Sequence, residues 1–327
     1  LEFNLEKAKI QYALARLNIE KNVTAAFYGV YQAYQRLVTA RDAFQSQKET
    51  YEMVKNKVGQ GLIPQEELFQ AEVTLASNEN SLADTEMSYE NTKDQFKQTL
   101  GLPLDIDISI LPDIQIETVN IDPNLAVKYA LDQRLEIRNQ QIAIEEGIFN
   151  LIEAKDNNKF KGSISARIGL VGQGGKFKGA FSKPDDNETI GVTLTVPIFD
   201  WGARKANIRS TELANESTEI SNEEERKSIT LDIRQLCREL PKLLRQIEIA
   251  RQTVKNAERT YDINVEKYRS GSLSGMELKN QQTQLTDAKN ALTDAIISYK
   301  LRLLDLKIQT LWDFKTNTSY LPVDLLK

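Results

Sequence analysis

Histidine is absent from this 327-residue chain, and cysteine occurs only once, as Cys237. The absence of histidine removes the most common general base and the most common metal ligand of proteins. A single cysteine excludes an intrachain disulfide framework and any multi-cysteine metal site. Neither a nucleotide-binding loop nor an acid–base constellation is recognisable. The sequence therefore predicts no catalytic residues, no metal site and no cofactor, which argues against an enzyme.

Glycine and proline are scarce, with 15 and 8 residues, so the elements between turns must be long. Ala, Leu, Gln, Glu, Lys and Asn dominate the composition, as is typical of extended helices. No apolar run reaches the roughly 18 residues that a transmembrane helix needs, so no transmembrane helix is predicted. The net charge of −5 provides no basic field that would attract nucleic acid.

The chain matches itself without a gap at an offset of 210 residues, over about sixty positions. Helical composition alone would rarely align glycines, tyrosines and a Glu-Leu pair together, so two copies of one structural unit are predicted. The matches include Gly61 with Gly271, Ala40-Arg41 with Ala250-Arg251, Thr50-Tyr51 with Thr260-Tyr261, Lys57 with Lys267, Glu67-Leu68 with Glu277-Leu278, and Ser88-Tyr89 with Ser298-Tyr299.

The repeat also bears on how the chain begins. Its first residues, Leu1-Glu2-Phe3-Asn4, are amphipathic and charged, and no signal peptide is recognisable. Either the start has been removed or the protein is cytoplasmic. Because Leu1 corresponds to Thr211, equivalents of residues 126–210 would precede Leu1 in a complete first copy. We therefore expect an N-terminally truncated chain that lacks its signal peptide and its first strand pair.

Long helices are predicted over residues 4–59 and 65–100 in the first copy and 203–269 and 275–313 in the second, with another over 126–157. Pro241 is expected to kink or break the longest of them. A coiled-coil seam steps by three and four at Leu37, Ala40, Phe44, Gln47, Tyr51, Val54 and Val58. The return helix repeats this spacing at Leu68, Ala71, Leu75, Asn78, Leu82, Thr85 and Tyr89.

The lengths of these helices suggest an architecture. At 1.5 Å per residue, residues 203–269 span about 100 Å, whereas 126–157 and 275–313 span about 48 and about 58 Å. Two shorter helices stacked end to end therefore match one long helix. A long hollow cylinder needs such an arrangement, and a compact globule does not. The predicted fold class is mainly α, with long antiparallel coiled-coil helices in two internal repeats.

Residues 162–199 change to a period of two, which predicts a pair of strands. Ile164, Ile168 and Leu170 alternate with polar residues and glycine before a polar loop, and Val192 and Leu194 do so after it. Strands of nine or ten residues with one apolar face have the length of a membrane-barrel hairpin. An ordinary amphipathic hairpin lying on the helices is the alternative. Residues 103–125, polar, β-branched and punctuated by proline, are expected to be a connector with a short strand.

The segment Val196-Pro197-Ile198-Phe199-Asp200-Trp201-Gly202 resembles the Pro-hydrophobic-Phe-x-x-Gly signature of the TolC-type outer-membrane efflux family. Tyr268-x-x-Gly271 followed by Glu277-Leu278 is similar to the helix-tip motif of that family, and Val58-x-x-Gly61-Leu62 with Glu67-Leu68 is a weaker version. The resemblance covers essentially the whole chain. It implies a homotrimer with an α-barrel tunnel across the periplasm, in which each complete protomer adds four strands to a twelve-stranded membrane β-barrel. One strand pair per chain would supply only half of that barrel.

We expect six segments along the chain. Residues 1–102 form the helical hairpin of an incomplete first repeat, and 103–125 form an equatorial connector. Residues 126–161 form the first helix of the second repeat, 162–199 the barrel hairpin, 200–314 the second helical hairpin, and 315–327 a C-terminal segment.

The resemblance also implies where sites lie. The two turns would form the periplasmic entrance and bind a membrane-fusion adaptor, through Val58, Gly59, Gly61 and Leu62 and through Arg269, Gly271 and Ser272. Glu277 and its repeat mate Glu67 would form an acidic ring at the tunnel entrance. Pro197, Phe199 and Gly202 mark the passage from strand to helix. The alternatives are ordinary: tight turns between helices, and carboxylates favoured at a helix start by its dipole.

The function predicted from these features is passive export of small molecules or proteins through an outer-membrane duct of a Gram-negative bacterium. The implied partners are the periplasmic adaptor, an inner-membrane pump, outer-membrane lipid and two further copies of the chain. A non-membrane coiled-coil scaffold is the alternative, which explains the heptads but not the strand hairpin that interrupts the helices.

Overall fold

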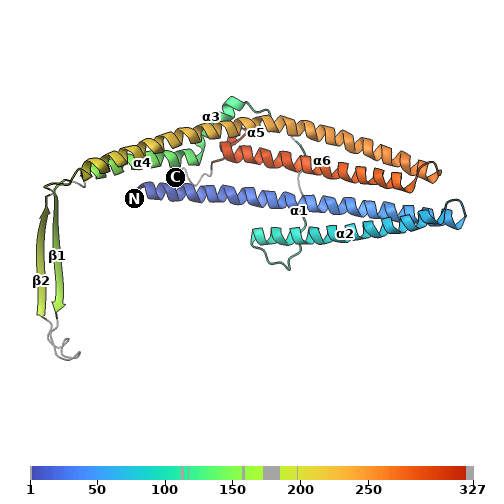
Figure 1. Cartoon of the computed structure of the whole chain (residues 1–327), viewed down its shortest axis with the longest axis horizontal. Coiled ribbons are helices and arrows are strands. Elements are labelled where there is room, and N and C mark those ends of the chain that lie inside the picture. Colours follow the sequence, from blue (N-terminus) through green and yellow to red (C-terminus); the bar gives the residue numbers. More distant parts are fainter. Residues whose placement is uncertain are drawn as a thin grey trace. The chain divides into compact units, whose positions relative to one another are not determined.

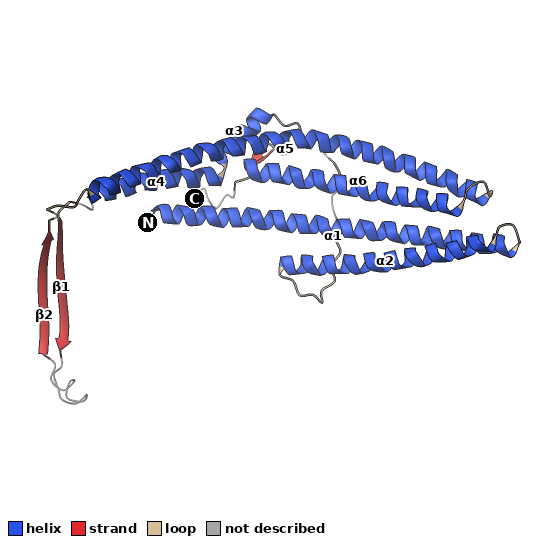
Figure 2. Cartoon of the chain, in the orientation of Figure 1, coloured by secondary structure: helices blue, strands red, loops and turns tan. Residues whose placement is uncertain are grey.

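The computed structural model describes residues 2–111, 114–116, 118–156, 159–171, 185–196 and 198–321. The chain divides into two compact units. The first comprises Leu1–Leu135 together with Lys227–Lys327, and the second comprises Glu136–Arg226. Long helices make up most of both units, as Figure 1 and Figure 2 show.

Two helical hairpins build the first unit. Helix α1 (Glu2–Gly59) turns back into α2 (Gln65–Leu100), and the C-terminal part of α5 (Ala203–Arg269) turns back into α6 (Gly275–Thr310). Helix α6 also contacts α1, where the Lys21 ammonium lies 2.7 Å from the Asp305 carboxylate. It contacts α5 through the pair formed by Arg302 and Glu239, 3.3 Å apart. The two hairpins therefore pack side by side.

The predicted coiled-coil seam is present between α1 and α2, because all of its positions are buried or half-buried. Leu37 and Val54 are the most enclosed seam positions of α1, with 3% and 1% of their surface exposed. Large side chains alternate with small ones such as Ala71, which lets the two helices approach closely. Burial of this stripe, rather than helix propensity, accounts for most of the stability of such a hairpin.

The two turns have the same backbone geometry. In the first, Gly61 donates to the Val58 carbonyl at 2.9 Å and Leu62 donates to the Lys57 carbonyl at 2.9 Å. In the second, the equivalent bonds of Gly271 and Ser272 measure 3.1 and 2.9 Å. Both glycines have positive φ, 71° and 79°, a conformation that only glycine adopts without cost. The repeat detected in the sequence is thus a structural repeat at the turns.

The helix predicted over 126–157 is in fact two helices. Helix α3 (Pro123–Gln133) begins after Asp122, whose carboxylate accepts a bond from the Asn124 amide at 2.8 Å. Arg134 is extended, with ψ of 129°, and α4 (Leu135–Asp156) follows. The cause is tertiary. Helix α3 contacts α6 and buries Ala126 and Ala130 completely, so its path is fixed by packing rather than by a glycine or proline at the break.

The end of α6 and the connector also differ from the predictions. Helix α6 stops at Thr310 instead of 313, because Leu311 takes a left-handed conformation. The next residues, β3 (Trp312–Asp313), pair with β4 (Thr318–Ser319), and Trp312 stacks on Tyr129 of α3. Among the described residues of 103–125 there is no strand. Helix α5 continues through Pro241 without a break.

The second unit contains α4, the first part of α5 and a strand hairpin. Asn215 of α5 donates to the Gly147 carbonyl of α4 at 2.8 Å, and a Cβ at Gly147 would meet the Asn215 side chain at 2.6 Å. Strands β1 (Lys161–Val171) and β2 (Asp185–Thr195) pair antiparallel in a register that places Lys161 opposite Thr195. Within the described ranges, no helix is both long enough and apolar enough to cross a membrane.

Candidate functional site

The two helix turns lie in the same unit and are linked by Lys57. Its ammonium group donates to the carbonyl oxygens of Tyr268 and Arg269, at 2.8 Å each. These carbonyls end α5, where the helix dipole places partial negative charge and a lysine is favourable. The Lys57 nitrogen also lies 5.3 Å from the centre of the Tyr268 ring. Lys57 was matched with Lys267 in the sequence repeat, but its role at the other turn was not predicted.

The predicted tip residues are mostly accessible. Val58 is half-buried, whereas the other predicted contacts are exposed: Gly59, Gly61, Leu62, Arg269, Gly271 and Ser272. Leu62 exposes 67% of its surface and so offers an apolar point of contact at the first turn. The Arg269 guanidinium is bound to Glu266 of its own helix at 2.8 Å. Adaptor binding by these residues stays a prediction.

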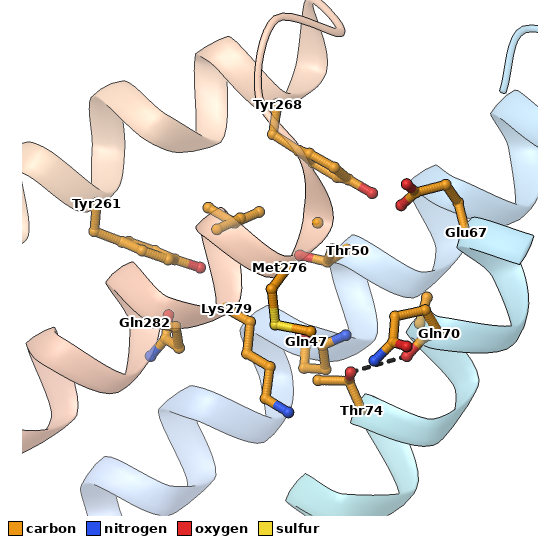
Figure 3. Close-up of a pocket in the computed structure, with 13 residues that line it drawn as sticks. Gln47, Thr50, Glu67, Gln70, Thr74, Tyr261, Tyr268, Met276, Lys279 and Gln282 are labelled. Atoms are coloured by element: carbon orange, nitrogen blue, oxygen red, sulfur yellow. Dashed lines mark hydrogen bonds between the residues drawn. The ribbon is translucent and has the colours of Figure 1, made fainter.

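A small apolar cluster joins the hairpins behind the turns. Val54, Ala71, Tyr268 and Leu278 are its buried members, one from each of the four helices. Beside it lies a small cavity of about 30 Å³, lined by both polar and apolar side chains and shown in Figure 3. Tyr268 and Glu67 point toward one another across this cavity. Burial raises the pKa of the Tyr268 hydroxyl, and the nearby Glu67 carboxylate raises it further.

Glu277 has a structural role that accounts for its position. Its carboxylate accepts bonds from the Ser274 amide at 3.0 Å and the Ser274 hydroxyl at 2.8 Å, while the Ser274 hydroxyl accepts one from the Glu277 amide. This reciprocal arrangement is a capping box that satisfies free amides at the start of α6. The bonds from Ser274 lower the pKa of the Glu277 carboxyl. An acidic ring formed by Glu277 and Glu67 stays a prediction.

Replacing Glu277 by glutamine is expected to loosen the first turn of α6 at neutral pH only. A carboxyl whose pKa is lowered by folding stabilises the fold above its unfolded pKa, and this contribution is lost as the pH falls through the lower folded value. Hydrogen exchange of the amides of the first turn of α6 should therefore differ between the two proteins at neutral pH and converge in acid. Glu66→Gln is the control, because α2 has no side-chain cap. A difference that persists in acid would contradict the assignment.

Replacing Lys57 by methionine is expected to loosen the end of α5. The substitution keeps the length of the side chain but removes two charge-assisted hydrogen bonds, which contribute about 2 kcal/mol to local stability. Hydrogen exchange of the last turn of α5 measures the change. Lys55→Met provides a matched control, because Lys55 is exposed on the same helix. Equal protection of the last turn of α5 in both variants would show that the contact carries no stability.

The predicted strand-to-helix signature is partly visible. Pro197 lies outside the described residues. Gly202 has φ of 85° and so needs to be glycine, and Phe199 is 71% exposed. Phe199 and Trp201, itself 90% exposed, meet edge to face at 4.8 Å. Such an exposed aromatic pair at the end of a strand hairpin is typical of a membrane–water interface.

Asp200 caps the helix that follows, and it was not predicted as a site residue. Its carboxylate accepts bonds from the amides of Gly202 at 3.1 Å and Arg204 at 2.9 Å. These bonds lower the pKa of the Asp200 carboxyl, the Arg204 amide having the largest effect. The signal was available in the sequence, because aspartate just before a helical run is a preferred cap.

The strand hairpin has two chemically distinct faces near its helix end, whereas toward the loop Glu188 and Asp186 lie opposite Ile168 and Leu170 on the otherwise apolar face. On one face the register pairs Ile164 with Val192 and Ala166 with Ile190. On the other it pairs Ser163 with Thr193. The apolar face is open, since Ile164 and Ile190 expose 79% and Val192 75% of their surface. A membrane-barrel hairpin and an amphipathic hairpin lying on the helices both stay predictions.

The acidic side chains and the single thiol are the other groups that could carry chemistry. In the part of the chain that the structure describes, no group of three or more His, Cys, Asp or Glu side chains could hold a metal ion. Cys237 is buried, and burial raises the pKa of its thiol, so the reactive thiolate is disfavoured.

Comparison with known proteins supports the resemblance drawn from the motifs. Residues 159–307 match the family model of outer membrane efflux proteins. The chain is 21% identical over 289 residues to the probable outer membrane lipoprotein SilC of Salmonella typhimurium, covering 87% of this chain and 61% of that protein. It is 23% identical over 195 residues to the fusaric acid resistance protein FusA of Burkholderia cepacia, covering 59% of this chain and 37% of that protein.

The fold is also shared with solved structures. The CmeC outer membrane channel of Campylobacter jejuni has a TM-score of 0.77 at 18% identity, covering 98% of this chain and 67% of that chain. The outer membrane protein VceC of Vibrio cholerae has a TM-score of 0.71 at 20% identity, with coverages of 94% and 72%. The chain spans less than two thirds of the length of SilC and of FusA. The resemblance predicted from the sequence is confirmed to this extent: residues 159–307 match the family model of outer membrane efflux proteins, and the chain shares the fold of outer membrane channels.

Proposed function

We propose that this chain forms part of the wall of an outer-membrane export duct. In this proposal three copies surround a tunnel built from the helical hairpins, and the strand hairpins enter the outer membrane. The duct is a passive conduit without catalytic activity. The match of residues 159–307 to the efflux family model and the shared fold support it.

The two-faced strand hairpin carries the proposal. An apolar face that is open in the monomer needs a partner that covers it, and lipid covers such a face at a membrane-barrel wall. The opposite face carries hydroxyl and charged side chains, such as Ser163, Thr193 and Arg167, which suit a water-filled lumen. Phe199 and Trp201 lie beyond the end of β2, where the wall would leave the membrane. A coiled-coil scaffold without membrane contact would have no use for this face.

The helix turns are proposed to form the periplasmic end of the duct and to bind the adaptor of a pump. Their support is the exposed Leu62 and the accessible backbone around Gly61 and Gly271, where a partner helix can approach closely. The names of the relatives indicate resistance to a small organic acid in one case and a membrane lipoprotein in the other. Small molecules are accordingly the proposed cargo.

Reconstitution in planar lipid bilayers tests the proposal directly. We expect discrete, long-lived conductance steps from purified chain, together with a trimer by light scattering in detergent. An unrelated coiled-coil protein at the same concentration is the negative control. A chain that binds no vesicles and gives no conductance would favour the non-membrane scaffold.

An arginine on the polar face of the strand hairpin sharpens the test. A Thr193→Arg substitution on the polar face should keep the steps and change their size, because the side chain would enter the lumen. Conductance that is indifferent to this change would contradict the proposed lining of the lumen.

A further inference from the structure

Arg167 is an exposed cation on the polar face of the strand hairpin. It lies in β1 and pairs with Thr189 of β2 in the antiparallel register. Lys161, on the same face at the helix end, is about 20 Å away along the strand. The register continues this face to Asp185 at the loop end of β2, about 13 Å beyond Thr189. Arg167 is therefore the charged residue closest to the middle of this face.

The polar groups beside Arg167 bond to one another. The Ser165 hydroxyl donates to the Gly191 carbonyl at 3.5 Å, and the Thr189 hydroxyl donates to the side-chain oxygen of Asn187 at 3.3 Å. All four of these neighbours are uncharged. The side chains next to Arg167 on its own face thus leave its positive charge without a compensating negative one.

Two acids of β2 lie on the other face of the hairpin. Glu188 pairs with Ile168 and Asp186 pairs with Leu170. Successive side chains of a strand point to opposite faces, so these carboxylates point away from the face that carries Arg167. They also end the apolar stripe on their own face, which places Arg167 level with the loop-side end of that stripe. Around Arg167 the hairpin therefore separates its charges, with the cation on the polar face and the acids on the other.

We infer that Arg167 gives the lumen of the proposed duct a preference for anions, so that small organic anions are favoured cargo. The inference rests on the proposed function, in which the polar face lines a water-filled lumen. Each of three copies then contributes one guanidinium at the same level of the wall. Rings of arginine or lysine favour anions in pores of this kind. Arginine stays charged throughout the physiological pH range, so the preference is independent of pH there.

Reversal potentials in planar lipid bilayers measure this preference. With a gradient of KCl across the membrane, we expect the chain to pass chloride more readily than potassium. The ratio of the two permeabilities should fall about twofold for Arg167→Gln and further for Arg167→Glu. The difference should be largest near 0.01 M salt, where the Debye length is about 30 Å, and should fade near 1 M, where it is about 3 Å. A merely structural role of Arg167 would not produce this dependence on salt.

Glu188→Gln is the matched control. It removes one charge next to Thr189, but from the other face of the same strand. The permeability ratio of this variant should equal that of the parent chain, because the carboxylate does not face the lumen. A shift as large as that of Arg167→Gln would show that the total charge of the hairpin sets the selectivity, and it would overturn the inference.

The substitution Arg167→Cys allows the charge to be restored chemically. The only cysteine of the parent chain, Cys237, is buried, so the parent chain treated with the same reagents is the control. Arg167→Cys should show the weak anion preference of Arg167→Gln. A methanethiosulfonate reagent that attaches a trimethylammonium group should restore the preference, and one that attaches a sulfonate should weaken it further.

The outcomes separate this inference from the proposed function. Conducting channels whose reversal potential is the same for the parent chain, for Arg167→Gln and after both reagents would overturn the inference and leave the duct intact. A chain that gives no conductance at all would overturn the duct and the inference together.

Discussion

Replacing Tyr268 by alanine is expected to lower the local stability of the helix tips by about 3–5 kcal/mol, the range for deleting a large aromatic side chain from a core. The Tyr268 ring is only 5% exposed and packs with Val54, Ala71 and Leu278, so each of the four helices contributes one buried residue to the cluster. Removing the ring leaves a void beside an existing cavity. Because the ring also lies under the Lys57 ammonium, the link between the two turns weakens as well.

Hydrogen exchange measured on peptides from the ends of α1 and α5 reports this change directly. Tyr268→Phe keeps the ring and removes only the hydroxyl, so it should cost less than about 1.5 kcal/mol, as conservative core replacements do. Peptides from α4, which lies in the other unit, serve as an internal control and should not change. If the alanine variant exchanges like the phenylalanine variant, the cluster is not a packed core.

Local sequence patterns were sufficient for most of the helices. The bounds of α5, the turn glycines and the seam of α1 all follow from periodicity and from the scarcity of glycine and proline. Gly61 and Gly271 could be located because a left-handed turn needs glycine and the repeat aligned the two residues. The alternation in the strand hairpin also predicted the faces that the register shows. In each case the cause acts within a few residues along the chain.

Contacts between distant segments could not be predicted in this way. No glycine or proline marks the break at Arg134 in the sequence. The burial of Ala126 and Ala130 against α6 fixes the break instead. The capping of α5 by Lys57 joins residues more than two hundred positions apart. The repeat showed that Lys57 and Lys267 are equivalent, but only the structure shows what Lys57 binds.

Glu277 illustrates how one residue can satisfy two explanations. The capping box with Ser274 explains its presence without any role at a tunnel entrance. Its repeat mate Glu67 has no such box, since Pro64 takes the N-cap position, and it faces Tyr268 of the other hairpin. Equivalent positions in the two copies therefore have different surroundings. The family resemblance alone could not separate these two carboxylates.

Replacing Val192 by arginine is expected to abolish most of the membrane binding of the strand hairpin. Val192 lies on the open apolar face opposite Ile164 and exposes 75% of its surface. An arginine facing lipid costs about 2–4 kcal/mol near the middle of the bilayer. A penalty of about 2 kcal/mol for each chain corresponds to about a thirtyfold fall in partition into vesicles, since 1.36 kcal/mol is a factor of ten. The effect is multiplied when three hairpins insert together.

The neighbouring residue supplies the decisive control. Thr193 lies one position further along β2, on the polar face opposite Ser163, so an arginine there changes the charge equally but points away from lipid. Flotation of the purified chain with liposomes should show loss of binding for Val192→Arg and nearly unchanged binding for Thr193→Arg. Equal loss for both would mean that charge alone, and not the face, governs binding. Equal retention would mean that lipid does not cover the apolar face, and the hairpin would then need another partner.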